Sequence, residues 1–329
     1  MRILCLYNLP ADPSAKDELD VFDQRDAVMI ALHDLGHEAE SYGTDLNLEK
    51  TIKKLDDYKP DLVFNLVEAL GGKGRFIHFI PTVLEQMRIP FTGADAAGLF
   101  LTTNKIITKQ KLMSAGISTP DWTTTELLKN KKPHFNPPYF IKPVCEDASV
   151  GLNETAVIYD PALLADELKD RSRQFGECFA EAYIPGREFN LSILPAESGI
   201  EVLPPAEIRF ENYPQDKLKI VDYKAKWDTD SFEYKNTVRH FDFPAGDARL
   251  LSDLKKAAEA CRKVFALKGY VRVDFRVDEK GMIWVLEINA NPCISPDSGF
   301  VAAANQAGLT FMEMIDKIVS GVSNPFKGI

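Results

Sequence analysis

The sequence feature that most limits the possible folds is a β-hairpin predicted over residues 269–290, with a tight turn at residues 279–280. That turn sets Arg272 opposite Glu287 and Asp274 opposite Val285. Because side chains alternate along a strand and paired residues share a face, the polar residues gather on one face. They are Arg272, Asp274, Glu287 and Asn289. The other face is apolar and carries Val273, Phe275, Leu286 and Ile288.

The polar face of this hairpin has two alternative interpretations. A solvent-facing strand pair with a cross-strand salt bridge between Arg272 and Glu287 is common. Alternatively, two carboxylates and an amide oxygen are the hard ligands that magnesium prefers. The hairpin continues into a polar loop over residues 290–295, and functional groups tend to lie where strands end in loops. The continuation favours a magnesium site.

The rest of the chain predicts an α/β fold. Apolar runs at residues 3–7, 37–42 and 61–65 alternate with helical patterns, which indicates a parallel sheet covered by helices. We place the first boundary near residue 100. Beyond it we expect strands at residues 139–142, 155–158, 178–183, 188–194 and 201–207, a polar loop over 210–230, and a long helix over 247–266.

Composition excludes several classes of protein. The net charge of -10 argues against nucleic acid as the main partner, because phosphate backbones demand clustered basic residues. No apolar run approaches the roughly 20 residues that cross a bilayer. The five cysteines are scattered without metal-ligand spacing, which indicates reduced thiols. We therefore expect a cytoplasmic protein without membrane or nucleic-acid partners.

Two further motifs indicate a nucleotide site. The predicted strand ending in Lys142 and the small-residue turn at residues 146–151 suit a phosphate, although such a lysine is usually only solvated. Glu181 and Glu188 flank the apolar turn at residues 184–186. An adenine pocket needs apolar walls and an acceptor, but two strands joined by a turn with exposed acids explain this spacing as well.

The order of these motifs resembles the ATP-grasp superfamily, specifically the D-alanine–D-alanine ligase group. The resemblance extends from Pro90-Phe91-Thr92-Gly93 to Gln306-Ala307-Gly308-Leu309 and includes Asn104-Lys105, Lys142-Pro143, Ser149-Val150-Gly151, Asp222-Tyr223-Lys224-Ala225-Lys226 and Glu287-Ile288-Asn289. It implies three modules: an N-terminal Rossmann-like domain over residues 1–100, a central ATP-grasp subdomain over 101–184, and a C-terminal subdomain with the magnesium site over 185–329. ATP would lie between the second and third modules.

The resemblance also implies a role for each site residue. Nucleotide contacts would come from Lys105, Lys142, Ser149, Glu181, Ile184, Glu188 and Lys226. Two magnesium ions, for which manganese is an acceptable substitute, would bind Asp274, Glu287 and Asn289. ATP would phosphorylate a substrate carboxylate, and a substrate amine would attack the acylphosphate. Arg272 would steady the oxyanion, with the backbone of Cys293 as its partner, and Ser298 would contact the incoming substrate's carboxylate.

The first third of the chain departs from that group. The family's glutamate for the substrate ammonium has only Glu18, Asp20 or Glu68 as possible replacements. Ala148 stands where the family has a serine and Trp227 where it often has a tyrosine. This pattern favours a ligase for another acid or amine, with true D-alanine–D-alanine ligation as the alternative.

Two other classes of protein are less favoured. An ATP-binding regulatory protein would have no use for Arg272 as an oxyanion residue. A nicotinamide oxidoreductase would need a G-x-G-x-x-G motif after residues 3–7, where none occurs. The family's habit of dimerising makes a homodimer possible, and the loop over residues 210–230 is expected to close over the substrates.

Overall fold

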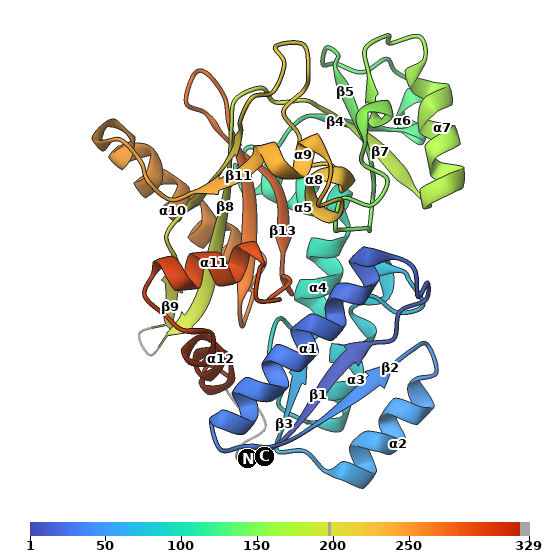
Figure 1. Cartoon of the computed structure of the whole chain (residues 1–329). Helices are drawn as coiled ribbons and strands as arrows, with labels where there is room; N and C mark the ends of the chain where they lie inside the picture. Colours follow the sequence, from blue (N-terminus) through green and yellow to red (C-terminus); the bar gives the residue numbers. More distant parts are fainter. Residues whose placement is uncertain (197–198, 323–329) are drawn as a thin grey trace.

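The chain begins with the parallel sheet that the sequence predicts. In this computed structural model, which describes residues 1–196 and 199–322, the first sheet has the strand order β2-β1-β3 (Figure 1). Residues 197–198 and 323–329 belong to the third predicted module and lie outside the described residues. The elements of this unit are β1 (Arg2–Asn8), α1 (Lys16–Asp34), β2 (Glu38–Thr44), α2 (Leu48–Tyr58), β3 (Leu62–Asn65) and α3 (Phe79–Met87).

Both faces of the first sheet are buried, as its apolar strands require. Ile3 and Cys5 of β1 point to the face covered by α1, whereas Leu4 and Leu6 point to the face covered by α2 and α3. Residues 90–93 add only a single parallel bridge to β3, through Phe91. The carboxyl ends of the strands lead into loops that border the rest of the molecule, where ligands bind in open α/β sheets.

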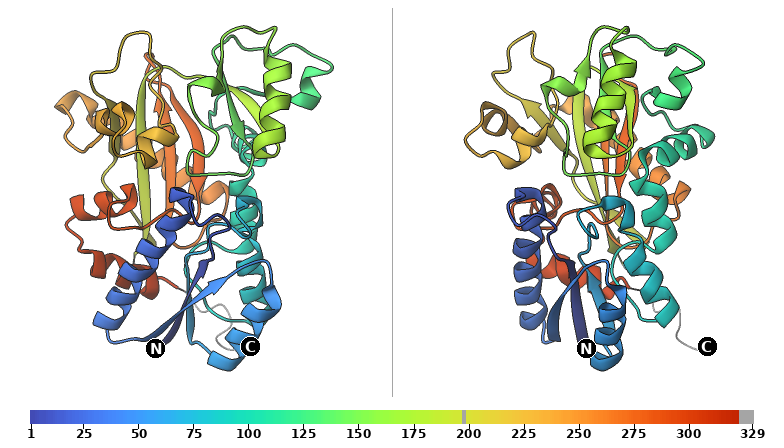
Figure 2. Two further views of the ribbon diagram at one scale, coloured as in Figure 1. Left: turned by 45° about the vertical axis from the view of Figure 1, so that its right-hand side comes forward. Right: turned by 90° about the vertical axis from the view of Figure 1, so that its right-hand side faces the viewer.

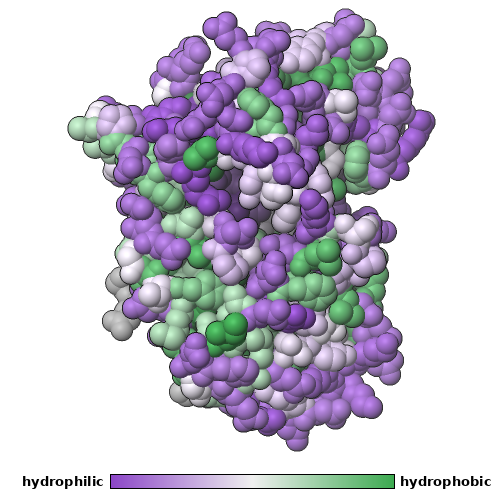
Figure 3. Space-filling model, in the orientation of Figure 1, coloured by the Kyte–Doolittle hydropathy of each residue, from purple (hydrophilic) through white to green (hydrophobic). Residues whose placement is uncertain are grey.

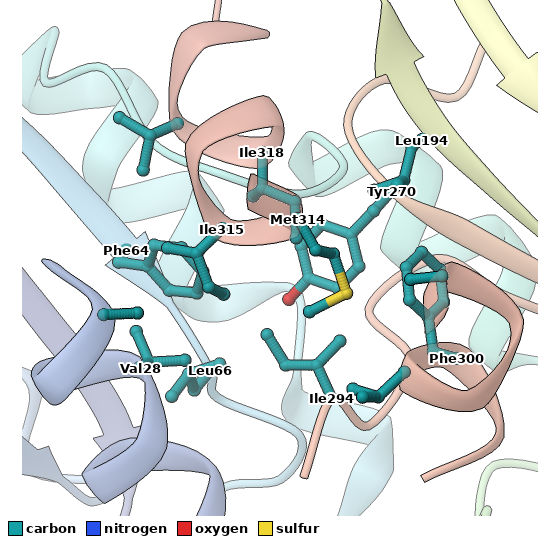
Figure 4. Close-up of a cluster of buried hydrophobic side chains, with 14 of the residues drawn as sticks. Val28, Phe64, Leu66, Leu194, Tyr270, Ile294, Phe300, Met314, Ile315 and Ile318 are labelled. Atoms are coloured by element: carbon teal, nitrogen blue, oxygen red, sulfur yellow. The ribbon is translucent and has the colours of Figure 1, made fainter. Parts of the chain in front are cut away.

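The largest hydrophobic core joins the two ends of the chain. Its N-terminal members come from β1, α1 and β3 and include Val28 and Phe64. The remaining members include Phe300, Met314 and Ile318, from α11 (Gly299–Gln306) and α12 (Phe311–Ser320) (Figure 4). The final helices therefore cover a face of the first sheet, and α12 packs directly against α1.

A small antiparallel sheet follows, in the order β4-β7-β5-β6. Figure 2 shows it in the upper half of the molecule, linked to the first sheet by two helices. The elements are α4 (Ala96–Thr103), α5 (Lys105–Ser114), β4 (Trp122–Thr124), α6 (Thr125–Leu128), β5 (Tyr139–Pro143), β6 (Val157–Ile158), α7 (Leu164–Phe175) and β7 (Cys178–Ala182). The expected strand over residues 155–158 is half wrong, because residues 154–156 form a 3-10 turn.

The third sheet has the order β11-β10-β8-β12-β13, with β9 paired to β8. The elements are β8 (Arg187–Ala196), β9 (Gly199–Val202), β10 (Ala206–Phe210), α8 (Tyr223–Trp227), α9 (Phe232–Asn236), β11 (Thr237–His240), α10 (Ala248–Val264), β12 (Val271–Val277) and β13 (Ile283–Asn289). The single strand predicted over residues 201–207 is wrong. Pro204 and Pro205 lack the N–H groups that a ladder needs, so the chain leaves β9 and re-enters the sheet as β10.

The register of the predicted hairpin is also wrong, although its polar face is correct. Asp274 lies opposite Glu287 rather than Val285, and Arg272 lies opposite Asn289 rather than Glu287. The turn is one residue longer than expected, and a β-bulge at Leu286 adds a second residue. The bulge sends Leu286 toward the cleft that the polar face borders and leaves Val285 fully buried in the core.

No described helix combines the length and apolar character needed to span a membrane.

Candidate active site

A cleft of about 1300 Å³ lies where the three sheets meet. Its walls come from the loops after β1 and β3, the strands β5 and β7, the segment around α8, and the hairpin β12–β13. The space-filling view shows a hollow among hydrophilic residues in the upper half of the molecule (Figure 3). All twelve predicted site residues line this cleft: Lys105, Lys142, Ser149, Glu181, Ile184, Glu188, Lys226, Arg272, Asp274, Glu287, Asn289 and Ser298.

The polar face of the hairpin forms a dense charged cluster. Arg272 donates from Nε and NH2 to the two carboxylate oxygens of Asp274, each at 2.8 Å. Asn190 of β8 donates to Oδ1 of Asp274 at 2.8 Å, because β8 is the other neighbour of β12. The Asn289 amide lies 3.4 Å from both Asp274 and Glu287. Two acids and an amide thus converge on one point.

The two acids of this cluster differ in their electrostatic surroundings. Burial raises the pKa of Asp274 to about 6, despite the opposing effect of Arg272. Burial also raises the pKa of Glu287, but three lysines outweigh it and hold that pKa well below its usual range. They are Lys105, Lys226 and Lys142. Glu287 is therefore ionised and faces the cationic side of the cleft.

Lys105 is positioned by the start of α5. The Asn104 side chain accepts hydrogen bonds from two amides of the first turn, which is typical of a helix N-cap, and so places Lys105 as the first helical residue. Its Nζ atom lies 2.7 Å from Oδ1 of Asp147 and 3.9 Å from Oε2 of Glu287. Burial lowers the pKa of Lys105, but these two acids outweigh burial and raise it above its ordinary value.

Glu181 holds two lysines at the end of β7. Lys142 lies 2.5 Å from one carboxylate oxygen, and Lys109 of α5 lies 2.7 Å from the other. Lys109 is 1% exposed and also donates to Thr119 and to the carbonyl of Pro120, each at 3.0 Å. Sequence reasoning missed Lys109. Its position four residues after Lys105, which places both on one face of a helix, is the signal that would have found it.

Glu188 has an unpredicted partner, Arg276. The guanidinium of Arg276 lies 2.7 Å from Glu188 and donates to the carbonyl oxygens of Ile184 and Gly186 at 3.5 and 3.3 Å. It also donates to the carbonyl of Lys219, in the segment predicted to close over the cleft. Side chains alternate along a strand, so Arg276 lies on the same face as Arg272 and Asp274. The sequence pattern could therefore have predicted Arg276 as a site residue.

The remaining predicted residues lie on the rim of the same cleft. Ser149, in the left-handed backbone region with φ of 61°, donates its hydroxyl to the carbonyl of Val221 at 2.9 Å and so ties the loop after β5 to the segment before α8. Lys226 lies in α8, whose first turn is capped by Asp222. Ser298 is the N-cap of α11 and accepts from the amide of Val301 at 3.3 Å.

Of the three acids that the sequence left open, Glu68 and Asp20 share a neighbour. The Gln24 amide donates to Glu68 at 2.8 Å and lies 3.4 Å from Asp20. Asp20 also accepts a hydrogen bond from the Cys293 thiol at 3.0 Å, and burial raises the pKa of Asp20. Glu18 instead turns back onto its own loop and accepts from the amide of Asp12 at 3.2 Å.

Three sheets around a cleft lined with lysines, acids and an acid-paired arginine define the ATP-grasp class of ligases. The chain belongs to the family described as "D-ala D-ala ligase C-terminus", whose model matches residues 111–320. It is accordingly an ATP-dependent ligase that forms carbon–nitrogen bonds and is similar to D-alanine–D-alanine ligases. The predicted superfamily and fold class are confirmed.

Individual relatives agree with this assignment. A D-alanine–D-alanine ligase of Aquifex aeolicus is 31% identical over 300 residues, covering 89% of this chain and 92% of the relative. The protein y4sG of Sinorhizobium fredii is 30% identical, covering 89% and 85%. The solved structure of a Bacillus anthracis D-alanine–D-alanine ligase complexed with ATP has the same fold, with a TM-score of 0.74 at 23% identity over 98% of this chain and 97% of that one.

Proposed function

We propose that this cleft joins the carboxylate of one small molecule to the amine of another through an acylphosphate made from ATP. The observation that carries the proposal is the convergence of Lys105, Lys142, Arg272, Asp274 and Glu287 on one cleft from one helix and two different sheets. A binder of nucleotides would have no use for a buried arginine beside two acids. Such preorganised charge is instead what stabilises an oxyanion.

The nucleotide would lie between β5–β7 and β12–β13. Lys105 and Lys142 are now paired with Asp147 and Glu181, and they would turn toward the phosphates. Glu181 would then be free to accept from the adenine amine, while the backbone of Ile184 borders the ring. Glu188, oriented by Arg276, would accept from the ribose hydroxyls. Ser149 and Lys226 would approach the terminal phosphate from the opposite wall.

The donor set at the hairpin fits magnesium, with manganese as a substitute. No group of three or more His, Cys, Asp or Glu side chains suited to a metal occurs within residues 1–196 and 199–322. Two carboxylates and an amide are nevertheless the usual protein share of a magnesium site, because substrate phosphates and water complete the coordination. Asp274 and Glu287 would hold the ions, and a turn of the Asn289 amide would offer its oxygen. The ions would neutralise charge on the transferring phosphoryl group.

The substrate side of the cleft supports a different acid or amine from D-alanine. The wall carries Cys293, whose thiol is held by Asp20, and Trp227, whose indole donates to the carbonyl of Ala148 at 3.0 Å. Arg272 and the backbone of Cys293 would steady the tetrahedral oxyanion, and Ser298 would contact the carboxylate of the incoming amine. These contacts support amino acids or peptides as the substrates.

Phosphate release from ATP and magnesium across the twenty L-amino acids, D-alanine and small carboxylates tests this proposal. We expect release with a restricted set and a condensed product by mass spectrometry. If D-alanine alone gives a dipeptide, the protein is a true D-alanine–D-alanine ligase. The D-alanine–D-alanine ligases among the relatives favour this alternative. ATP binding without any release would favour the non-enzymatic alternative.

Three features of the chain remain proposals. The division into modules at residues 100 and 184 is supported by the separate sheets, although the first module shares its core with the last helices. A cytoplasmic location is supported by the charge and by the reduced cysteines. A homodimer rests on the family resemblance, and sedimentation would test it.

A further inference from the structure

The carboxylate of Glu68 is held in place at one oxygen and open at the other. Glu68 follows β3, and its backbone N–H donates to Oδ1 of Asn8 at 3.0 Å. Oε1 accepts from Gln24 at 2.8 Å, and Gln24 is itself fixed because its own oxygen accepts from the amide of Ile294 at 2.9 Å. Within residues 1–196 and 199–322, Oε2 has no hydrogen-bond or ion-pair partner. Glu68 lines the cleft, so one oxygen of an oriented carboxylate is left without an internal partner there.

The surroundings of Glu68 favour proton exchange near neutral pH. Burial raises the pKa of this carboxyl to about 7, assisted by the charges of Asp20 on α1 and Asp147 after β5. Gln24 and Arg272 act in the opposite direction. Two further groups face it, the Tyr270 hydroxyl and the Cys293 thiol. No cation within the described part of the chain forms an ion pair with Glu68.

The proposed reaction needs a group with these properties. An amine enters as an ammonium ion, which has no lone pair and cannot attack an acylphosphate until it loses a proton. Four other acids that border the same cleft already serve cations: Asp147, Glu181, Glu188 and Asp274 pair with Lys105, Lys142, Arg276 and Arg272. Asp20, the acid that shares Gln24 with Glu68, already accepts a hydrogen bond from the Cys293 thiol. The indole of Trp227 and the carbonyl of Ala148 bond to each other and offer no base.

We propose that Glu68 is a catalytic base that takes a proton from the ammonium of the second substrate. The inference rests on the proposed function. An N–H bond of the ammonium breaks and its proton moves to Oε2 of Glu68. The freed electron pair forms the C–N bond at the acyl carbon, and the bond from that carbon to the phosphate oxygen breaks, with phosphate taking the electron pair. A second proton leaves the nitrogen with the phosphate, and Glu68 returns its own to water.

Hydroxylamine separates this role from simple binding of substrate. It is largely unprotonated at neutral pH, so it traps an acylphosphate as a hydroxamate without help from a base. For the carboxylate that gives phosphate release in the panel above, we expect Glu68→Gln to lower amide formation by about a hundred-fold or more. Hydroxamate formation should stay within about threefold of wild type, because acylphosphate formation does not need the base. The matched control is Glu49→Gln on α2, which removes an exposed carboxylate outside the cleft and should leave both products unchanged.

The pH profile gives a second measurement. Amide formation by wild type should rise through about pH 7, since Glu68 must be ionised to accept the proton, and this rise should vanish in Glu68→Gln. A parallel loss of amide and hydroxamate in the variant, with the fold intact by thermal unfolding, would mean that Glu68 binds the first substrate and would overturn the inference. Failure of wild type to form hydroxamate with any carboxylate would instead refute the proposed function.

Discussion

The two ends of the cleft balance their charges differently. At the end formed by α5, β5, β7 and the hairpin, acids lie against cations, as in the pairs Lys105–Asp147 and Lys142–Glu181. At the end formed by α1 and the loop after β3, the half-buried acids Asp20 and Glu68 make hydrogen bonds to neutral groups instead. Residues from both ends line the same cavity.

This difference indicates what each end receives. Paired charges can be exchanged, because an incoming phosphate would take a lysine from its internal acid. Unpaired acids in a partly dry site favour a cationic group, because burial makes the lone negative charge costly. The paired end thus suits a nucleotide and the unpaired end an ammonium. Each of the four predictions below tests one end of the cleft.

The largest effect is expected at the hairpin acids. Asp274→Asn or Glu287→Gln should lower kcat by at least about a hundred-fold, since even the outer partners of metal ligands cost that much. The fold should persist, which thermal unfolding checks. Glu279→Gln in the exposed turn of the same hairpin is the control. Near-normal turnover in either cleft variant would refute the metal assignment.

Lys109 tests whether pairing at the nucleotide end also supports the fold. Lys109→Met leaves one oxygen of the buried Glu181 without its cation, and we expect the free energy of unfolding to fall by about 3 kcal/mol. Lys129→Met, which removes an exposed pair with Glu126, should cost less than about 0.5 kcal/mol. Equal denaturant midpoints for the two variants would contradict this expectation.

Glu68 tests the unpaired end through pH. Its folded pKa of about 7 lies above the ordinary 4.5, so the folded protein holds this proton more tightly than the unfolded chain does. The resulting stability is present below about pH 4.5 and is lost as the pH rises to about 7. Relative to wild type, Glu68→Gln should therefore gain about 2 kcal/mol across that window in denaturant titrations. A constant difference between the two proteins would show that Glu68 is solvated.

The smallest effect is expected at Asp147, the internal partner of Lys105. Asp147 is half exposed, so the pair adds little to stability. Asp147→Asn should nevertheless tighten ATP binding about two- to fivefold, because Lys105 no longer has to leave an acid. Calorimetric titration measures this, and weaker binding would show that Asp147 itself contacts the nucleotide side.

Alternation along strands predicted the polar face of the hairpin even though the register was wrong. The longer turn and the bulge each add one residue, and a shift of two restores the face, so Asp274 and Glu287 still meet. Between turn and bulge the shift is only one, which is why Leu286 and Val285 exchange their predicted sides. Local sequence carries no strong signal for a bulge that neighbouring strands impose.

The sequence alone could not predict which residues from distant segments contact one another. Lys109 and Arg276 each lie one helical or strand repeat from a predicted residue, but only the fold shows that they face Glu181 and Glu188. The contact between Gln24 and Glu68 joins residues 44 positions apart. The short strands β4 and β11 were also missed, because three or four residues give too little periodicity to detect.

The core shared by β1 and α12 has a consequence for how the protein is made. The ribosome releases β1 and α1 first, yet the hydrophobic core that they share with α11 and α12 stays incomplete until the final helices emerge some 300 residues later. During translation the nascent chain therefore exposes part of this apolar core, which is prone to association, and the central part emerges before the N-terminal unit is complete. A transcript truncated before α11 would yield a protein that lacks α11 and α12 and so has an incomplete core, even if the hairpin β12–β13 folds.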